Sequence, residues 1–322
     1  MKIKLYSRDT LWMVIGTLVL LLALILVWHF QTGHKSIEQL ALKARRVNIV
    51  AQMRLDLTSA SEAEKSAVLA ITDQDSKTFA DQTRMATLKV EQEKNELGEL
   101  LAREGTRSEK ELIAQFSVVF KELQLIDNDL LTLAIRNTNI KAYSLAFGPA
   151  SDALREMDTA LSSLVAKSAS YPEARDIALH ARGAQISAWH IQSLLAPHIA
   201  EESDKKMDEF EVQMTREDHE VRRDLSGLAV IQEFRGSPDL KSAVSDYTRF
   251  SDIRVRILAL SRENTNVQSL SISLGQKRMK QLQCQEVLSA LQQAISEEPE
   301  INGNYGYVFN PRNIQGDNIK DK

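Results

Sequence analysis

The chain has 322 residues, a formal net charge of -4 and only 12 Gly, 6 Pro and 1 Cys. So few turn residues argue against a many-stranded sandwich or barrel, and the abundance of Ala, Leu, Glu, Gln, Lys and Arg is typical of long helices. A single cysteine excludes an intrachain disulfide, and the near-neutral charge without a sustained basic stripe argues against nucleic acid as a partner.

The first predicted element is a membrane anchor at residues 11–30. This run, LWMVIGTLVLLLALILVWHF, contains no charged residue and is long enough to cross a bilayer. Trp12 and Trp28 lie near its two ends, where aromatic rings favour the headgroup boundary. No small-residue cleavage site follows, so we expect an uncleaved single-pass transmembrane helix. The basic tail at residues 1–10 favours a cytoplasmic N-terminus, which places the bulk of the chain on the extracytoplasmic side.

Four helices are predicted between the anchor and the middle of the chain. Thr72 or a neighbouring Asp is suited to cap the second of them. Gly148-Pro149 breaks or kinks the third, since proline lacks a backbone donor, and the fourth then runs back along it. The expected helices are residues 36–71, residues 77–103, a third that begins after Thr106 or Ser108, and residues 151–167.

The second half repeats this plan. The segment ASYPEA at residues 169–174 is expected to join the halves, and RGSPD interrupts the helices further on. Residues 298–322 change abruptly to Asn, Gly, Pro and Asp, which is typical of a disordered polar tail. The expected helices are a segment ending near Ile199, residues 203–234, a helix from Asp239 and a last segment ending near Glu297.

Two stretches of the chain are alike. TLAIRNTNIKAYSLAFG at residues 132–148 and ALSRENTNVQSLSISLG at residues 259–275 carry Asn-Thr-Asn at the same place and end on the same glycine. The offset between them is 127 residues (264 − 137), which indicates an internal duplication of a domain-sized unit. We therefore expect two tandem antiparallel four-helix bundles, residues 31–168 and 169–297.

Within each copy, apolar residues step by three and four, as in the heptad seam of a coiled coil. Asn137 and Asn264 fall on equivalent seam positions, with Ser144 and Ser271 on the next. A buried Asn in a seam fixes register and partner choice at a cost in stability, because a shifted alignment leaves its amide unpaired. The alternative is that these four residues form a polar layer that binds a small ligand inside a bundle.

No sequence feature favours an enzyme. The chain has no glycine-rich phosphate loop and no GxSxG motif, and its histidines lack the i, i+4 spacing of a metal-ligand pair. His180, His190 and His198 are therefore expected to be packed or solvated, and Cys284 to be a small core residue. Trp189 fits a core or groove position. We expect no catalytic residue, no metal site and no cofactor.

The segments ILALSRENTNVQSLSISLGQKRMKQLQCQEVLSALQQAI and LLTLAIRNTNIKAYSLAFGPASDALREMDTALSSL resemble the extracytoplasmic four-helix-bundle sensor modules of bacterial methyl-accepting chemotaxis receptors. The resemblance covers about residues 36–297, and it implies a dimeric, periplasmic sensor held on the bacterial inner membrane that serves chemotaxis and signal transduction. Such receptors continue into a second transmembrane helix, a HAMP relay and a signalling hairpin, whereas this sequence ends in a polar segment. It also has no AGxxRM-like box from which a ligand would follow.

Two functions are therefore expected as alternatives. The first is a membrane-anchored sensory or adaptor module, a homodimer that binds a small molecule or a receptor or signalling protein. The second is a non-catalytic helical scaffold or spacer at the cell envelope, which fits the heptad seams and the lack of charged residues converging on a pocket.

Overall fold

The computed structural model of the chain is built of helices. It describes the backbone of residues 8–234 and 236–297, and within those ranges the side chains of residues 18, 20–22 and 38 onward. Throughout these residues the elements are α-helices, two π-helical turns and one 3-10 turn, without a strand. The all-α prediction is thus confirmed for the described part of the chain, and the predicted tail at residues 298–322 lies outside it.

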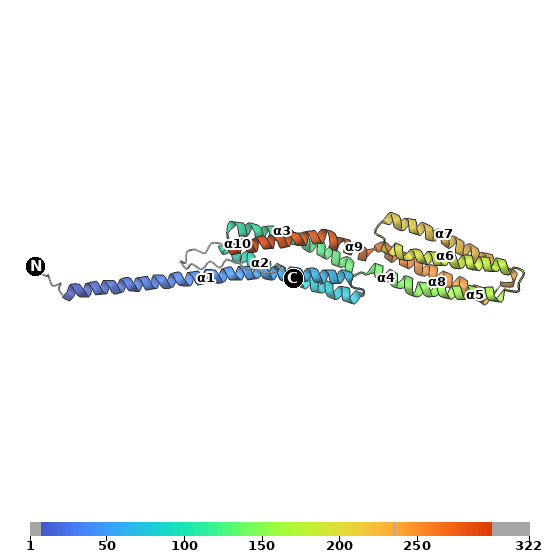
Figure 1. Cartoon of the computed structure of the whole chain (residues 1–322), viewed down its shortest axis with the longest axis horizontal. Coiled ribbons are helices and arrows are strands. Elements are labelled where there is room, and N and C mark those ends of the chain that lie inside the picture. The colour runs from blue at the N-terminus through green and yellow to red at the C-terminus, as the bar shows by residue number, and fades with distance from the viewer. Residues whose placement is uncertain (1–7, 235, 298–322) are drawn as a thin grey trace, which may run out of the picture.

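The helices form two bundles placed end to end in one elongated molecule (Figure 1). We call the bundle nearer the N-terminal end of α1 the proximal bundle and the other the distal bundle. The helices of the proximal bundle are α1 (Arg8–Leu69), α2 (Asp73–Glu104), α3 (Arg107–Ala134), α9 (Thr265–Ile272) and α10 (Arg278–Glu297). Those of the distal bundle are α4 (Thr138–Leu145), α5 (Ser151–Lys167), α6 (Ala174–Ala200), α7 (Asp204–Val230) and α8 (Pro238–Glu263).

The two bundles exchange helices, so they are not the sequential units 31–168 and 169–297 that the repeat predicts. α5 packs against α6 and α8, whereas α10 returns to pack against α3 and α1 (Figure 1). Each repeat copy therefore supplies three helices to one bundle and two helices, joined by a π turn, to the other. The reason is that each long helix continues through the middle of the molecule instead of turning back.

The helix continues through Gly148-Pro149, where the sequence predicts a break or a kink. A π-helical turn, η1 (Ala146–Ala150), contains Pro149 and joins α4 directly to α5. The wider π turn accommodates a proline that an α-helix would not, because it relieves the clash with the preceding turn. The equivalent turn η3 (Ser273–Lys277) joins α9 to α10 although Gln276 takes the place of proline, so proline alone does not cause the π turn.

Each bundle has its own hydrophobic core. Fully buried large apolar side chains contribute roughly 1.5–3 kcal/mol each when they leave water, so these cores dominate the stability of both bundles. The proximal core includes Val50, Leu97, Phe120, Leu288 and, as predicted, the buried Cys284. The distal core includes Leu154, Ile191, Val221 and Phe250.

Helix α1 is a single helix of 62 residues that begins at Arg8, runs through the predicted anchor and ends in the proximal bundle (Figure 1). Most side chains of residues 11–30 lie outside the described set. Among the residues that were described, no helix combines the length and the apolar character needed to cross a membrane.

Two of the predicted helix caps are present. The Thr72 hydroxyl accepts a hydrogen bond from the backbone N–H of Asp75 at the start of α2. Thr106 and Glu109 form a reciprocal capping box at the start of α3. These caps fix where α2 and α3 begin. α3 starts directly after Thr106, as predicted, whereas α2 starts at Asp73, directly after its Thr72 cap and four residues before the predicted start at residue 77.

Candidate functional site at the waist

The two long helices meet between the bundles at the repeated Asn-Thr-Asn sequence, which we call the waist (residues 137–139 and 264–266). Asn137 has φ 49° and Asn264 has φ 50°, and within the described residues no other non-glycine residue has a positive φ. Asn tolerates this left-handed conformation better than most residues. Each Asn therefore ends one helix and starts the next, so that α3 gives way to α4 and α8 to α9.

A left-handed residue inside a helix interrupts the backbone hydrogen bonds. The amides of the two residues after each such Asn lose their intrahelical acceptors in a buried region, where an unpaired N–H costs about 1–3 kcal/mol. The other repeat copy supplies the acceptors. Thr138 N donates to Thr265 Oγ1 at 3.3 Å, and Thr265 N donates to Thr138 Oγ1 at 3.1 Å.

The second Asn of each motif completes the exchange. Asn139 N donates to Asn266 Oδ1 at 3.2 Å and Asn266 N to Asn139 Oδ1 at 3.1 Å. Their side-chain amides then donate to the first Asn of the opposite motif, Asn139 to Asn264 at 2.7 Å and Asn266 to Asn137 at 3.0 Å. Each of these bonds between the two motifs has a counterpart in the other direction, so the waist has local pseudo-twofold symmetry.

This geometry gives each position of Asn-Thr-Asn a separate task. The first Asn adopts the left-handed backbone conformation and accepts a hydrogen bond through its side chain. The Thr hydroxyl accepts a hydrogen bond from a backbone N–H of the opposite motif. The second Asn accepts from a backbone N–H of the opposite motif and donates to the side chain of that motif's first Asn. The motif occurs twice because each copy satisfies the amides that the other copy exposes.

The structure places the four candidate residues in two different environments. Asn137 and Asn264 are buried, with exposed fractions of 1% and 4%, but Ser144 and Ser271 are exposed and take no part in the waist. The seam does not continue past the left-handed residue, because that residue rotates the following helix. The core-facing residues after it in the first copy are instead Ala142, Ala146 and Ala150.

Thr138, Asn139, Thr265 and Asn266 are waist residues that the heptad analysis missed. The available signal was the repeat itself, since all three letters of the motif are retained at an offset of 127 residues. Heptad periodicity identifies the residues on the buried face of an unbroken helix. It does not identify side chains that hydrogen-bond to the backbone where a helix is interrupted.

The waist also holds the loops that approach it from each bundle. The Asn137 side chain donates to Ser76 Oγ at 2.8 Å and to Asp73 Oδ1 at 3.2 Å, at the start of α2. Asn264 donates to the backbone oxygen of Glu201 at 2.8 Å, between α6 and α7. A hydrogen bond and ion pair from Lys141 hold the pKa of Asp73 below its usual value. The waist is thus bonded to the start of α2 in the proximal bundle and to the α6–α7 connection in the distal bundle.

On its distal side the waist adjoins a buried histidine. His198 is fully buried, with Nδ1 2.8 Å from Ser261 Oγ and Nε2 3.0 Å from Glu211 Oε1. Burial lowers the pKa of His198, although Glu211 opposes the shift. The prediction that this histidine is packed holds, and its neighbours are a serine and a carboxylate that Arg262 also contacts at 2.7 Å.

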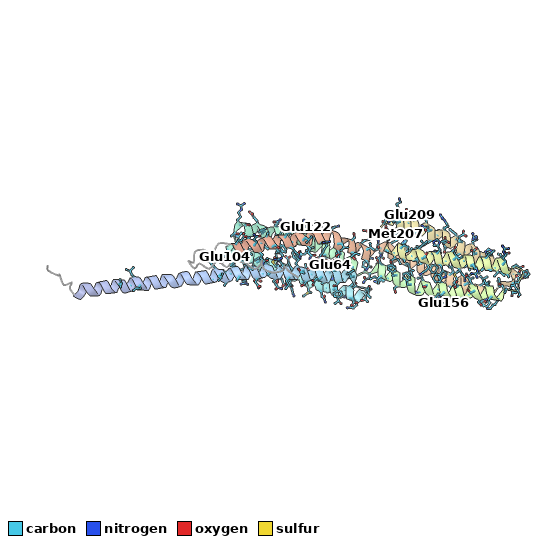
Figure 2. All side chains as sticks on the ribbon, in the orientation of Figure 1. Glu64, Glu104, Glu122, Glu156, Met207 and Glu209 are labelled. Carbon is cyan, nitrogen blue, oxygen red and sulfur yellow. The ribbon has the colours of Figure 1, made fainter. Side chains whose placement is uncertain are left out.

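On its proximal side lies a buried group that we call the charged layer: Ser61, Glu64, Asp127, Lys277 and Gln281. Lys277 Nζ donates to Glu64 Oε2 at 2.8 Å and to Ser61 Oγ at 3.1 Å, and Ser61 donates to Gln281 at 2.7 Å. Figure 2 labels Glu64 on α1 within the proximal bundle. Burial raises the pKa of Asp127 to about 6, while Lys277 lowers it and Glu64 raises it further.

The distal bundle contains a different polar cluster. Asp218 accepts hydrogen bonds from Tyr247 at 2.6 Å and from Arg254 at 3.1 Å, and pairs with Arg222 at 2.7 Å. Burial raises the pKa of Asp218, but the bonds from Arg222 and Tyr247 outweigh this and leave it below its usual value. The cluster is therefore an ionic contact between α7 and α8 in which one carboxylate binds two guanidinium groups.

The comparisons with known proteins and the search for metal ligands add no assignment. No protein-family model and no curated protein sequence gives a significant match to the chain. Across the described residues, no group of three or more His, Cys, Asp and Glu side chains is arranged to hold a metal ion. The chemistry of the waist is accordingly that of a neutral hydrogen-bond network that connects two bundles.

Proposed function

We propose that the protein is a membrane-anchored extracytoplasmic sensory or adaptor module of the chemoreceptor sensor type, which acts by binding a ligand or a protein partner and performs no catalysis. The observation that carries this proposal is that two long helical segments, α3–α4–η1–α5 and α8–α9–η3–α10, each run from one bundle into the other and are interrupted at the left-handed Asn of the waist. A displacement of either helix in the distal bundle has a covalent route into the proximal bundle and so toward α1.

The hydrogen bonds of the waist support the proposal that it transmits motion between the two bundles and is more than a flexible linker. Interfaces that change between discrete arrangements transmit motion, and short buried hydrogen-bond networks are elements of that kind. The six waist residues bond to one another and to both adjoining loops. Tilting one bundle against the other therefore changes contacts in both.

The proposal includes a homodimer on the bacterial inner membrane, with a receptor or signalling protein as the partner. In Figure 1 the first part of α1 extends beyond the proximal bundle, and no other described helix lies beside it. That stretch, which contains the predicted anchor, is available for a second copy or for lipid.

The second candidate is a non-catalytic scaffold or spacer at the cell envelope. The waist favours this candidate, because its buried polar side chains are hydrogen-bonded to one another. In the described part of the chain, the buried side-chain atoms without a hydrogen-bond partner lie outside the waist. In a rigid spacer, buried polar groups are hydrogen-bonded within the protein, whereas a ligand site keeps some polar groups unpaired until the ligand binds.

Membrane attachment is tested first on the full chain expressed in bacteria. Extraction of membranes with alkaline carbonate is expected to leave the protein in the pellet, and release into the supernatant would contradict the anchor. A tag after residue 322 is expected to be digested by protease in spheroplasts with an intact inner membrane. Its protection would contradict the extracytoplasmic placement.

Sensing is tested on the detergent-solubilised full chain with amino acids, organic acids, nitrate and aromatic compounds. A ligand that binds only the folded protein raises its melting temperature. In a Cys284→Ala background, spin labels at exposed Leu125 and Met279 report on the proximal bundle, and labels at exposed Leu179 and Val212 report on the distal one. We expect a bound ligand to change distances in both pairs. No melting shift, no distance change and no captured receptor or signalling protein would together favour the scaffold.

A further inference from the structure

The charged layer contains more negative than positive groups in a place without water access. Its exposed fractions are 0% for Glu64, 2% for Lys277 and 6% for Asp127, so one ammonium faces two carboxyl groups. Lys277 is bonded to Glu64 Oε2, whereas Glu64 Oε1 and Asp127 Oδ1 have no hydrogen-bond partner among the described residues. An uncompensated buried charge is costly, and uptake of a proton by a carboxyl group removes that cost.

The layer is an addition to the fold and not a requirement of it. At the equivalent level of the distal bundle, Ala150 stands where Lys277 stands, and Arg254 where Asp127 stands, at the repeat offset of 127 residues. When α1 and α6 are aligned at their last residues, Leu195 takes the place of Glu64. The same architecture therefore forms with an alanine and a leucine at this level.

The groups that face Asp127 come from every helix around it. Glu64 is on α1, Lys277 on η3, and α10 adds the buried thiol of Cys284 and Lys280, which pairs with Glu122 of α3 at 2.7 Å. The buried residues of α2 and α9 are uncharged. Lys277 is therefore the one cation bonded inside the layer as described; it pairs with Glu64 and acts on Asp127 only through its electric field.

We infer that the charged layer is a proton-operated latch that holds α3 against α1 and η3 beside the waist. With a proton on Asp127 the layer is neutral as a whole and closed. After the proton leaves, a net negative charge remains between the three elements, and the contact loosens. Because Lys277 is the last residue of a π turn that continues into α9 and the waist, the loosening reaches the joint between the bundles.

The latch does not depend on whether the protein binds a ligand or a partner. Its readout is amide hydrogen exchange of α3 and η3 in the solubilised full chain, corrected for the intrinsic pH dependence of exchange, from about pH 5 to about pH 8. Protection is expected to fall by about tenfold or more across a midpoint near pH 6.

In a Glu93→Gln background, which removes the separate titration of Glu93 near pH 7, Asp127→Asn removes the titrating group of the layer and is expected to keep protection high across the whole range. Asp129→Asn is the matched control, since Asp129 is exposed on the same helix, and it should retain the wild-type transition. A transition that persists in Asp127→Asn, or one that disappears in Asp129→Asn, would overturn the inference.

A second variant covers the case in which Asp127→Asn does not fold. Lys277→Met removes the cation that favours the ionised carboxyl group, so the midpoint should move to higher pH by about one unit or more. A midpoint that stays in place or moves to lower pH would show that the layer does not control the transition.

Discussion

At the scale of single residues, the waist depends on a backbone conformation that few side chains tolerate. Asn137 and Asn264 are buried, left-handed and hydrogen-bonded through both side-chain atoms. Sequence analysis singled out both residues as buried polar positions of a seam. It could not place them at a helix break, because their neighbours keep helical periodicity on both sides.

The first prediction reverses the usual order of helix propensity. Ala is normally about 1 kcal/mol better than Gly inside a helix, but a left-handed residue with a Cβ costs roughly 1–2 kcal/mol. Asn264→Ala should therefore lower the free energy of unfolding by about 2–4 kcal/mol, and Asn264→Gly by less, since Gly loses only the side-chain bonds. Urea unfolding of the solubilised full chain measures both.

Ser271 provides the control, because it is exposed in α9 seven residues further on. There, Ser271→Ala should be more stable than Ser271→Gly by about 1 kcal/mol. If the Ala variant is more stable than the Gly variant at both positions, the waist does not require a left-handed conformation at residue 264.

The second prediction concerns pH. Burial raises the pKa of Glu93 to about 7, and the neighbouring carboxylate of Asp56 adds to the shift. The unfolded chain releases this proton near its ordinary pKa of 4.5, whereas the folded chain retains it until about pH 7. The folded state therefore binds more protons in this window, and stability must fall as the pH rises through it.

With allowance for the partial exposure of Glu93, the loss should be about 1–2 kcal/mol. Glu93→Gln should abolish this part of the pH dependence in urea unfolding, while Glu99→Gln, at an exposed position of the same helix, should leave it unchanged. An undiminished slope in Glu93→Gln would mean that Glu93 is not the group that binds this proton in the folded state.

At the scale of elements, the two π turns show how the long helices stay continuous. Sequence reasoning took Gly148-Pro149 as a helix end, because proline in an α-helix removes one hydrogen bond and clashes with the preceding turn. Both turns begin nine residues after their left-handed Asn, at Ala146 and Ser273. In η1 the carbonyl of Ala146 accepts a bond from Gln192 at 2.7 Å, so tertiary contact satisfies the altered backbone. Periodicity alone carries no information about such a bond.

The third prediction follows from the internal comparison. Because η3 forms its π turn with Gln276 in place of proline, Pro149→Ala should keep the π turn and change the free energy of unfolding by less than about 1 kcal/mol. Gln192→Leu should cost more, about 1–2 kcal/mol, because it leaves the buried Ala146 carbonyl without a donor. The opposite ranking would locate the cause of the π turn in the proline itself.

At the scale of the whole molecule, the repeat predicted two bundles but not their composition. Periodicity identifies the face of a helix that is buried, and a duplication identifies which helices are alike. Neither says which neighbour covers that face. The exchange of helices between the bundles follows from the waist. There, each long helical segment changes direction at its left-handed Asn and is hydrogen-bonded to the other segment as it passes into the other bundle.

The fourth prediction tests that exchange by splitting the chain after Ala169, in the connection between α5 and α6. The first fragment then has three proximal helices but lacks α10, and its α5 has no partner; the second has three distal helices but lacks α5. Each fragment alone should expose apolar surface and unfold without a cooperative transition. Co-expression should restore a one-to-one complex that unfolds cooperatively, because every missing helix is then present. A protease site at the same position, cut after folding, is the matched control: the halves should co-elute until urea is added. If either fragment folds alone as a cooperative monomer, the bundles are sequential units and the waist is only a linker.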